Sequence, residues 1–138
     1  YILDIIKKNK KLNDIVIATN FLQGGLKVSA IKLANATILP SRGENFGVSV
    51  VESIALSTIP LITNKVGLHK EIKRYNAGYV YNDDVRSISK MINNFINIEI
   101  KMLKIMKKNC LKCYNNVFNI KNKDNDLLKL FNKINIYN

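Results

Sequence analysis

Short runs of apolar and mostly β-branched residues alternate with helix-like segments along most of the chain. These strand-like runs are Asp14–Phe21, Ala36–Leu39, Pro60–Thr63 and Gly78–Tyr81. The gaps between them show the apolar spacing of helices, and each gap has room for one helix. Strands that alternate with single helices form βα units, which build a parallel sheet covered on both faces. The sequence therefore predicts an α/β fold.

Helices are expected in most of the remaining segments. Asp83 or Asp84 can cap the helix that begins near Val85, because a side-chain oxygen there accepts an N–H group of the first turn. From Asn119 onward the chain is rich in Asn and Lys, so a marginal helix or a frayed tail is expected. The predicted helices are Tyr1–Lys11, Val28–Asn35, Phe46–Ser57, His69–Tyr75, Val85–Ile98 and Ile100–Val117.

The charge of the chain narrows the kinds of partner that it can have. Lys and Arg number 22 against 10 Asp and Glu, and the net charge of +12 favours phosphates, nucleic acid or an anionic membrane surface. The lysines are scattered, so a solvated basic surface accounts for most of this charge. No apolar run approaches the roughly 20 residues that cross a bilayer.

The two cysteines indicate neither a metal site nor an oxidising compartment. Cys110 and Cys113 form half of a zinc motif, but there is no second pair, and His69 is the only histidine. Two reduced thiols one helical turn apart are the favoured interpretation. No signal peptide is recognised at the start of the sequence. A cytoplasmic location is therefore expected, with the cytoplasmic face of a membrane as an alternative.

Two glutamates mark the region in which function is expected. Glu44 lies in a polar turn after the Ala36–Leu39 strand, and Glu52 follows eight positions later. Glu52 is the only charge in a helix that is otherwise apolar on nearly every side, so it is expected to be buried. A buried carboxylate is costly unless another group pairs with it. We therefore expect either a structural cation or a ligand beside Glu52.

The turn Ser41–Gly47 is the predicted ligand-binding loop. It follows a strand, and ligands of open α/β sheets bind outside the carboxyl ends of the strands. It also leads into a helix N-terminus, whose free N–H groups and dipole attract phosphate. Gly43 and Gly47 allow the backbone to approach a ligand closely. These features predict a phosphate-bearing ligand at this loop.

This loop and its surroundings resemble a known enzyme family. Residues 39–47 read LPSRGENFG, and Glu52 follows them. A proline-serine turn, a Glu, a Phe-Gly pair and a second Glu eight positions after the first are similar to the signature of the retaining GT-B glycosyltransferases of family 4, or glycosyl transferases group 1. The resemblance covers roughly Leu12 to Ile88, and Pro60-Leu61-Ile62 and Val66-Gly67 follow in matching order.

The resemblance implies a Rossmann-like domain that binds a UDP- or GDP-sugar as the donor. Glu44 would be the catalytic residue, beside the sugar hydroxyls near the reacting carbon. The backbone amides of Asn45, Phe46 and Gly47 would contact the sugar and the diphosphate, and Glu52 would accept hydrogen bonds from the ribose. The implied reaction moves a hexose to a glycan or lipid-linked acceptor with retention of configuration. Such enzymes usually need no metal, so no cofactor and no metal ligand are expected.

The sequence also departs from the family pattern. Ser57 stands where the family usually has glycine at a helix end, and Asn20 replaces a glycine before the loop. The Arg and Lys that grip the diphosphate, and the N-terminal domain that binds the acceptor, have no recognised counterpart, so a fragment of a longer enzyme is expected. Residues 1–98 are expected to be a partial nucleotide-sugar-binding domain, and residues 99–138 to be C-terminal helices and a tail.

Two other functions stay open. A non-catalytic basic module could bind nucleic acid or an anionic membrane, but no helix-turn-helix, aromatic RNA-binding motif or zinc finger is recognised, so nucleic acid is not the expected partner. A truncated fragment could instead serve only as a scaffold. The basic surface also allows a transferase to associate peripherally with a membrane.

Overall fold

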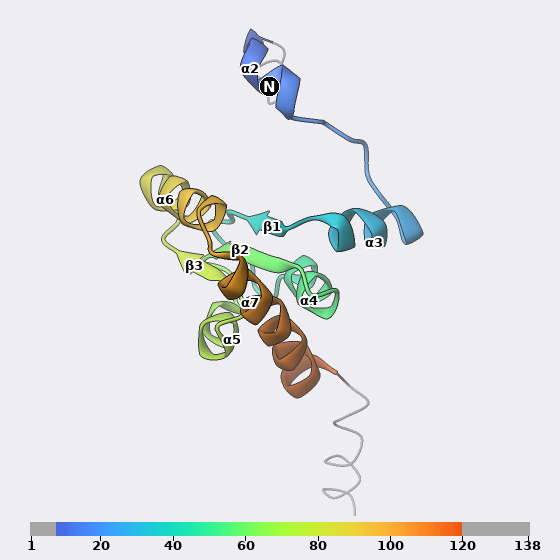
Figure 1. Cartoon of the computed structure of the whole chain (residues 1–138), viewed down its shortest axis with the longest axis vertical. Coiled ribbons are helices and arrows are strands. Elements are labelled where there is room, and N and C mark those ends of the chain that lie inside the picture. Colours follow the sequence, from blue (N-terminus) through green and yellow to red (C-terminus); the bar gives the residue numbers. More distant parts are fainter. Residues whose placement is uncertain (1–7, 120–138) are drawn as a thin grey trace, which may run out of the picture.

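A computed structural model of the chain describes residues 8–119. At its centre is a parallel sheet of three strands in the order β1-β2-β3 (Figure 1). Ile38 pairs with Leu61 across the first two strands, and Ile62 pairs with Val80 across the second and third. The strands are β1 (Ala36–Leu39), β2 (Ile59–Thr63) and β3 (Tyr79–Tyr81), which confirms the predicted α/β fold with a parallel sheet.

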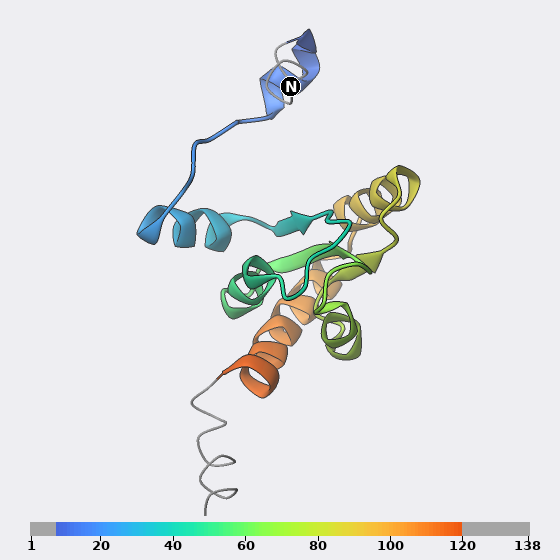
Figure 2. The same ribbon diagram turned by 180° about the vertical axis from the view of Figure 1, so that it is seen from behind.

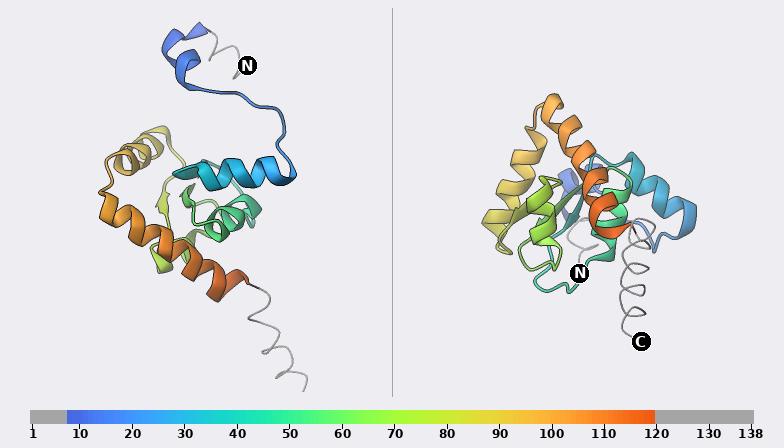
Figure 3. Two further views of the ribbon diagram at one scale, coloured as in Figure 1. Left: turned by 45° about the vertical axis from the view of Figure 1, so that its right-hand side comes forward. Right: turned by 90° about the horizontal axis from the view of Figure 1, so that it is seen from below.

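Helices lie on both sides of the sheet. One side carries α6, which contacts β2 and β3, and the other carries α4, α5 and α7 (Figures 1 and 3). In the view from behind, α3 extends beyond β1 at the side of the sheet (Figure 2). The helices are α2 (Lys10–Ile15), α3 (Gly24–Leu33), α4 (Val48–Ala55), α5 (His69–Tyr75), α6 (Val85–Ile96) and α7 (Ile100–Cys113), followed by the π-helix η1 (Tyr114–Phe118).

The core is built around β2, which is buried along its whole length. It receives apolar side chains from helices on both sides of the sheet, and those that are fully buried include Val50, Ile54, Ile72 and Met91. β1 is different because it lies at the edge of the described sheet, and its Ile38 is 47% exposed. The prediction of a sheet covered on both faces therefore holds for β2 but not for β1.

The ends of two helices have clear local causes. Asp84 caps α6 by accepting the N–H of Ser87 at 2.8 Å, and hydrogen bonds from Ser87 hold the pKa of Asp84 below its usual value. After α4, Ser57 has a φ of +59°, in the left-handed region that glycine adopts most readily. The glycine that the family usually carries at this place would suit that conformation.

The strand predicted at Asp14–Phe21 is wrong. α2 covers its start, and residues 16–23 have no regular secondary structure. Ile17 and Phe21 are 89% and 86% exposed. A strand is stable only when it pairs with a neighbour, and no strand between residues 8 and 119 pairs with this segment. The predicted helix Tyr1–Lys11 lies mostly outside the described residues, and the predicted tail lies outside them from residue 120 on.

Both cysteines lie on the core side of α7 as free thiols, which agrees with the reduced interpretation. The Cys110 thiol donates to the carbonyl oxygen of Ala77 at 3.0 Å. Desolvation by burial raises the pKa of Cys110 to about 12 and that of Cys113 to about 11, from 9.0. The thiols are therefore structural rather than reactive.

We expect both thiols to react slowly with iodoacetamide in the native protein and quickly in concentrated urea, because alkylation requires an exposed thiolate. Mass spectrometry of timed samples measures the labelling, and equally fast labelling of native and unfolded protein would contradict this expectation.

The same pKa values predict a loss of stability in alkali. Unfolded thiols ionise near 9.0, so the stability present below that pH is lost as the pH rises toward 11 and 12.

Candidate functional site

The loop between β1 and α4 is fixed to the segment that follows β2. The N–H of Glu44 donates to the Lys65 carbonyl at 3.1 Å, and the N–H of Gly67 donates to the Glu44 carbonyl at 2.7 Å. The hydroxyl of Thr63 donates to the Ser41 carbonyl. The 41–47 loop is thus held where the carboxyl ends of β1 and β2 meet, which is the ligand-binding edge of an open α/β sheet.

Two glycines allow this close approach of backbone segments. Gly47, immediately before α4, has a φ of +80°, and a Cβ there would lie 3.1 Å from Val66 Cγ1. A Cβ on Gly67 would lie only 1.9 Å from the carbonyl oxygen of Asn45. The loop and the segment after β2 therefore leave no room for a side chain at Gly67.

The side chain of Glu44 folds back onto its own loop. Its Oε1 accepts the N–H of Phe46 at 3.3 Å and that of Gly47 at 3.1 Å. Two of the three amides predicted to contact the donor are therefore occupied by this carboxylate. Its other oxygen, Oε2, takes part in no hydrogen bond among residues 8–119. The structure brings Glu44 together with Phe46 and Gly47, at the start of α4.

Glu52 has a cation beside it. A structural cation is one of the two alternatives that the sequence leaves open, the other being a ligand. Lys27 Nζ, from α3, lies 2.6 Å from Glu52 Oε1. The two side chains are about one-third to two-fifths exposed, so the pair is partly buried. Glu52 Oε2 is shielded from solvent and has no hydrogen-bond partner in the described part of the chain. One acceptor at this site is therefore unsatisfied, which is unusual for a buried oxygen.

Two residues that contact the site, Lys27 and Phe118, could not be predicted from the sequence. Lys27 is one lysine among many, on a helix that precedes the loop. The Phe118 ring, at the end of η1, lies edge-on to the Phe46 ring, with 6.2 Å between centroids and an interplanar angle of 80°. Neither contact has a local sequence signal, because each joins segments that only the fold brings together.

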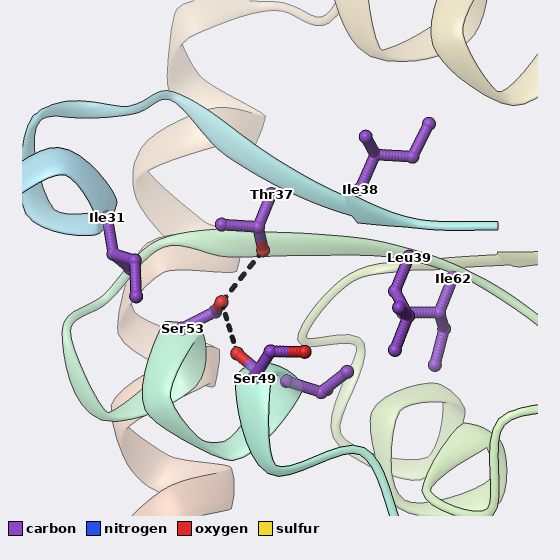
Figure 4. A pocket seen from close by; sticks show the side chains of 8 residues that line it. Ile31, Thr37, Ile38, Leu39, Ser49, Ser53 and Ile62 are labelled. Atoms are coloured by element: carbon purple, nitrogen blue, oxygen red, sulfur yellow. Dashed lines mark hydrogen bonds between the residues drawn. The ribbon is translucent and has the colours of Figure 1, made fainter. Parts of the chain in front are cut away.

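A cavity of about 280 Å³ lies between α3, β1 and α4 (Figure 4). The Thr37 hydroxyl donates to Ser53 Oγ at 2.8 Å, and Ser53 donates to the Ser49 carbonyl at 2.6 Å, which fastens α4 to β1. Ser49 precedes Glu52 by three positions and so shares its face of α4. The cavity lining is mostly aliphatic with a few hydroxyls: Ile31, Thr37, Ile38, Leu39, Ser49, Val50, Ser53 and Ile62.

No group of three or more His, Cys, Asp or Glu side chains between residues 8 and 119 could hold a metal ion together. None of the helices in that range is long and apolar enough to cross a membrane.

Comparisons with known proteins agree with this architecture. No curated protein matches the chain. Among solved structures, sucrose-phosphate synthase from Thermosynechococcus elongatus is similar in fold, with a TM-score of 0.80 and 17% sequence identity over 99% of this chain. The match covers 34% of that protein, so this chain spans about a third of its length. Residues 3–112 match the family described as "Glycosyl transferases group 1". The chain therefore belongs to the glycosyl transferases group 1 family and has the fold of part of a GT-B glycosyltransferase.

Proposed function

We propose that this chain is the donor-binding part of a retaining glycosyltransferase of family 4, which transfers a hexose from a UDP- or GDP-sugar to a glycan or lipid-linked acceptor. Its membership of the glycosyl transferases group 1 family supports the transferase reaction. In this proposal a further domain binds the acceptor, no metal or cofactor takes part, and the enzyme acts in the cytoplasm or at the cytoplasmic face of a membrane.

The observation that carries the proposal is the unsatisfied oxygen of Glu52. Its Oε1 is paired with Lys27 at 2.6 Å, whereas Oε2 is shielded from water and accepts no hydrogen bond within residues 8–119. A hydroxyl group that displaces the side chains covering this oxygen would satisfy it, because an unmade hydrogen bond there costs free energy. A ribose offers two adjacent hydroxyl donors, which suits this carboxylate.

The N-terminus of α4 supports the diphosphate part of the proposal. Val48 and Ser49 are the first two residues of the helix, so their N–H groups have no intrahelical acceptor. The helix dipole also favours an anion at this end. We place the diphosphate here, between a sugar at Glu44 and a ribose at Glu52. The amides of Asn45, Phe46 and Gly47 would join the contact when Glu44 turns its carboxylate toward the sugar hydroxyls.

Calorimetric titration with UDP and GDP tests this proposal. The wild-type chain is expected to bind at least one of them, and Glu52→Ala to bind it about tenfold more weakly, because a hydrogen bond to a charged group is lost. Binding of neither nucleotide would contradict the proposal. Binding of RNA or anionic vesicles without nucleotide binding would favour a basic module instead.

A second titration separates ribose recognition from damage to the ion pair. The 2′-deoxynucleotide should bind more weakly than the ribonucleotide to the wild type but equally well to Glu52→Ala. Glu71→Ala, in α5, serves as the matched control for removal of a carboxylate. An equal penalty for the deoxynucleotide in wild type and Glu52→Ala would show that Glu52 does not bind the ribose.

A further inference from the structure

The C-terminal end of the described chain packs against the 41–47 loop. Phe118 is the last residue of η1, and its ring lies edge-on to that of Phe46, with 6.2 Å between centroids. We infer that Phe118 is a positioning residue, which holds Phe46 and the adjoining amides of the loop in the geometry that binds the donor. The link to the donor rests on the proposed function.

A change of helix type directs Phe118 toward the loop. On a continuous α-helix, Phe118 would share the side of Leu111, because seven residues make about two turns. Leu111 is 41% exposed. The helix instead widens at its end, where the N–H of Asn119 donates to the carbonyl of Tyr114 at 3.0 Å, five residues back. The wider turn rotates Phe118 inward, and η1 packs against α4 and the core.

The segment after β2 holds Glu44 and Asn45, whereas the Phe46 side chain contacts the Phe118 ring. The pairing of Glu44 with the segment after β2 fixes Glu44, and the close approach of Gly67 fixes Asn45. Phe46 is 50% exposed, and its N–H is one of the two that Glu44 Oε1 accepts. Without the Phe118 ring, the Phe46 side chain would lose this neighbour, and the hydrogen bonds to Glu44 Oε1 would be left to hold the Phe46 and Gly47 amides. Phe118 therefore acts on the loop through Phe46.

A second aromatic pair offers a matched control. Phe95, in α6, lies edge-on to Tyr79 with 6.3 Å between centroids and an interplanar angle of 84°. This pair has nearly the same geometry as Phe46 and Phe118, but it lies at β3, away from the loop. Loss of either ring contact should cost similar stability. Only the loss of the Phe118 ring should alter hydrogen exchange at the loop amides.

Amide hydrogen exchange measured by NMR tests the inference without any ligand. Phe118→Ala is expected to speed exchange at Phe46 and Gly47 about tenfold relative to Ile62 in the core, because an aromatic contact is lost and the loop opens locally. Phe118→Leu keeps most of the apolar volume and should restore part of the protection. Phe95→Ala should leave unchanged the ratio of the exchange rates at Phe46 and Gly47 to the rate at Ile62. A ratio in Phe118→Ala no larger than that in Phe95→Ala would overturn the inference.

Titration with UDP and GDP then connects the loop to the donor. Phe118→Ala is expected to bind the preferred nucleotide about three- to tenfold more weakly, and Phe95→Ala to bind it as the wild type does. Equal affinity of wild type and Phe118→Ala would overturn the positioning role. If the wild type binds neither nucleotide, the proposed function fails, but the exchange ratio still decides whether Phe118 positions the loop.

Discussion

Replacing Gly67 with alanine is expected to destabilise the protein by about 3 kcal/mol, since a forced backbone rearrangement belongs to the most damaging class of substitution. The new Cβ would lie 1.9 Å from the Asn45 oxygen and 2.8 Å from its carbonyl carbon. Both atoms belong to the backbone, so no side chain can rotate away. The 41–47 loop must then separate from the segment after β2, which breaks the hydrogen bond from Gly67 to Glu44.

Gly43→Ala is the matched control for Gly67→Ala, because it lies in the same loop and a Cβ there would meet no atom within 4 Å. Thermal melts followed by circular dichroism should show a fall of roughly 10 °C or more for Gly67→Ala and almost none for Gly43→Ala. Nucleotide affinity should fall with the loop geometry. Melting of Gly67→Ala at the wild-type temperature would mean that the two backbone segments are not in direct contact.

Local patterns in the sequence account for most of the fold. The strand Ala36–Leu39 has the predicted bounds, and Pro60–Thr63 needs only one more residue at its start. Asp84, one of the two residues predicted to cap α6, does so with its carboxylate. Each of these features depends on residues next to one another, such as a β-branched run or a capping side chain. For the same reason the position of Glu44 at a strand end could be predicted.

The features that the sequence did not predict depend on distant partners. The segment Asp14–Phe21 has the composition of a strand, but strand formation also needs a neighbour, and the described sheet provides none for it. The need for a group beside Glu52 could be predicted from its apolar helix, but not that the group is Lys27. The inward rotation of Phe118 depends on a π-turn that apolar spacing does not reveal.

Replacing Glu44 with alanine is expected to weaken the binding of the preferred nucleotide-sugar about a hundredfold. Two effects combine in this loss. Each hydrogen bond to a charged group contributes about 1.5–3 kcal/mol. In the free chain, the N–H groups of Phe46 and Gly47 lose the acceptor that orders them before the donor binds. In the proposed complex, the sugar also loses a carboxylate that accepts its hydroxyl protons. Calorimetry with UDP-glucose and GDP-mannose, each compared with its free nucleotide, measures the sugar contribution separately.

Glu44→Gln distinguishes the two effects because its amide oxygen can still accept both N–H groups. Amide exchange at Phe46 and Gly47 should stay near the wild-type rate in Glu44→Gln and rise in Glu44→Ala. If Glu44 also contacts the sugar, Glu44→Gln should lose about tenfold in affinity for the nucleotide-sugar and little for the nucleotide, because the charge of the acceptor is gone. Wild-type affinity for the nucleotide-sugar in Glu44→Gln would limit Glu44 to ordering the loop in the donor complex, and its proposed contact with the sugar hydroxyls would then be wrong.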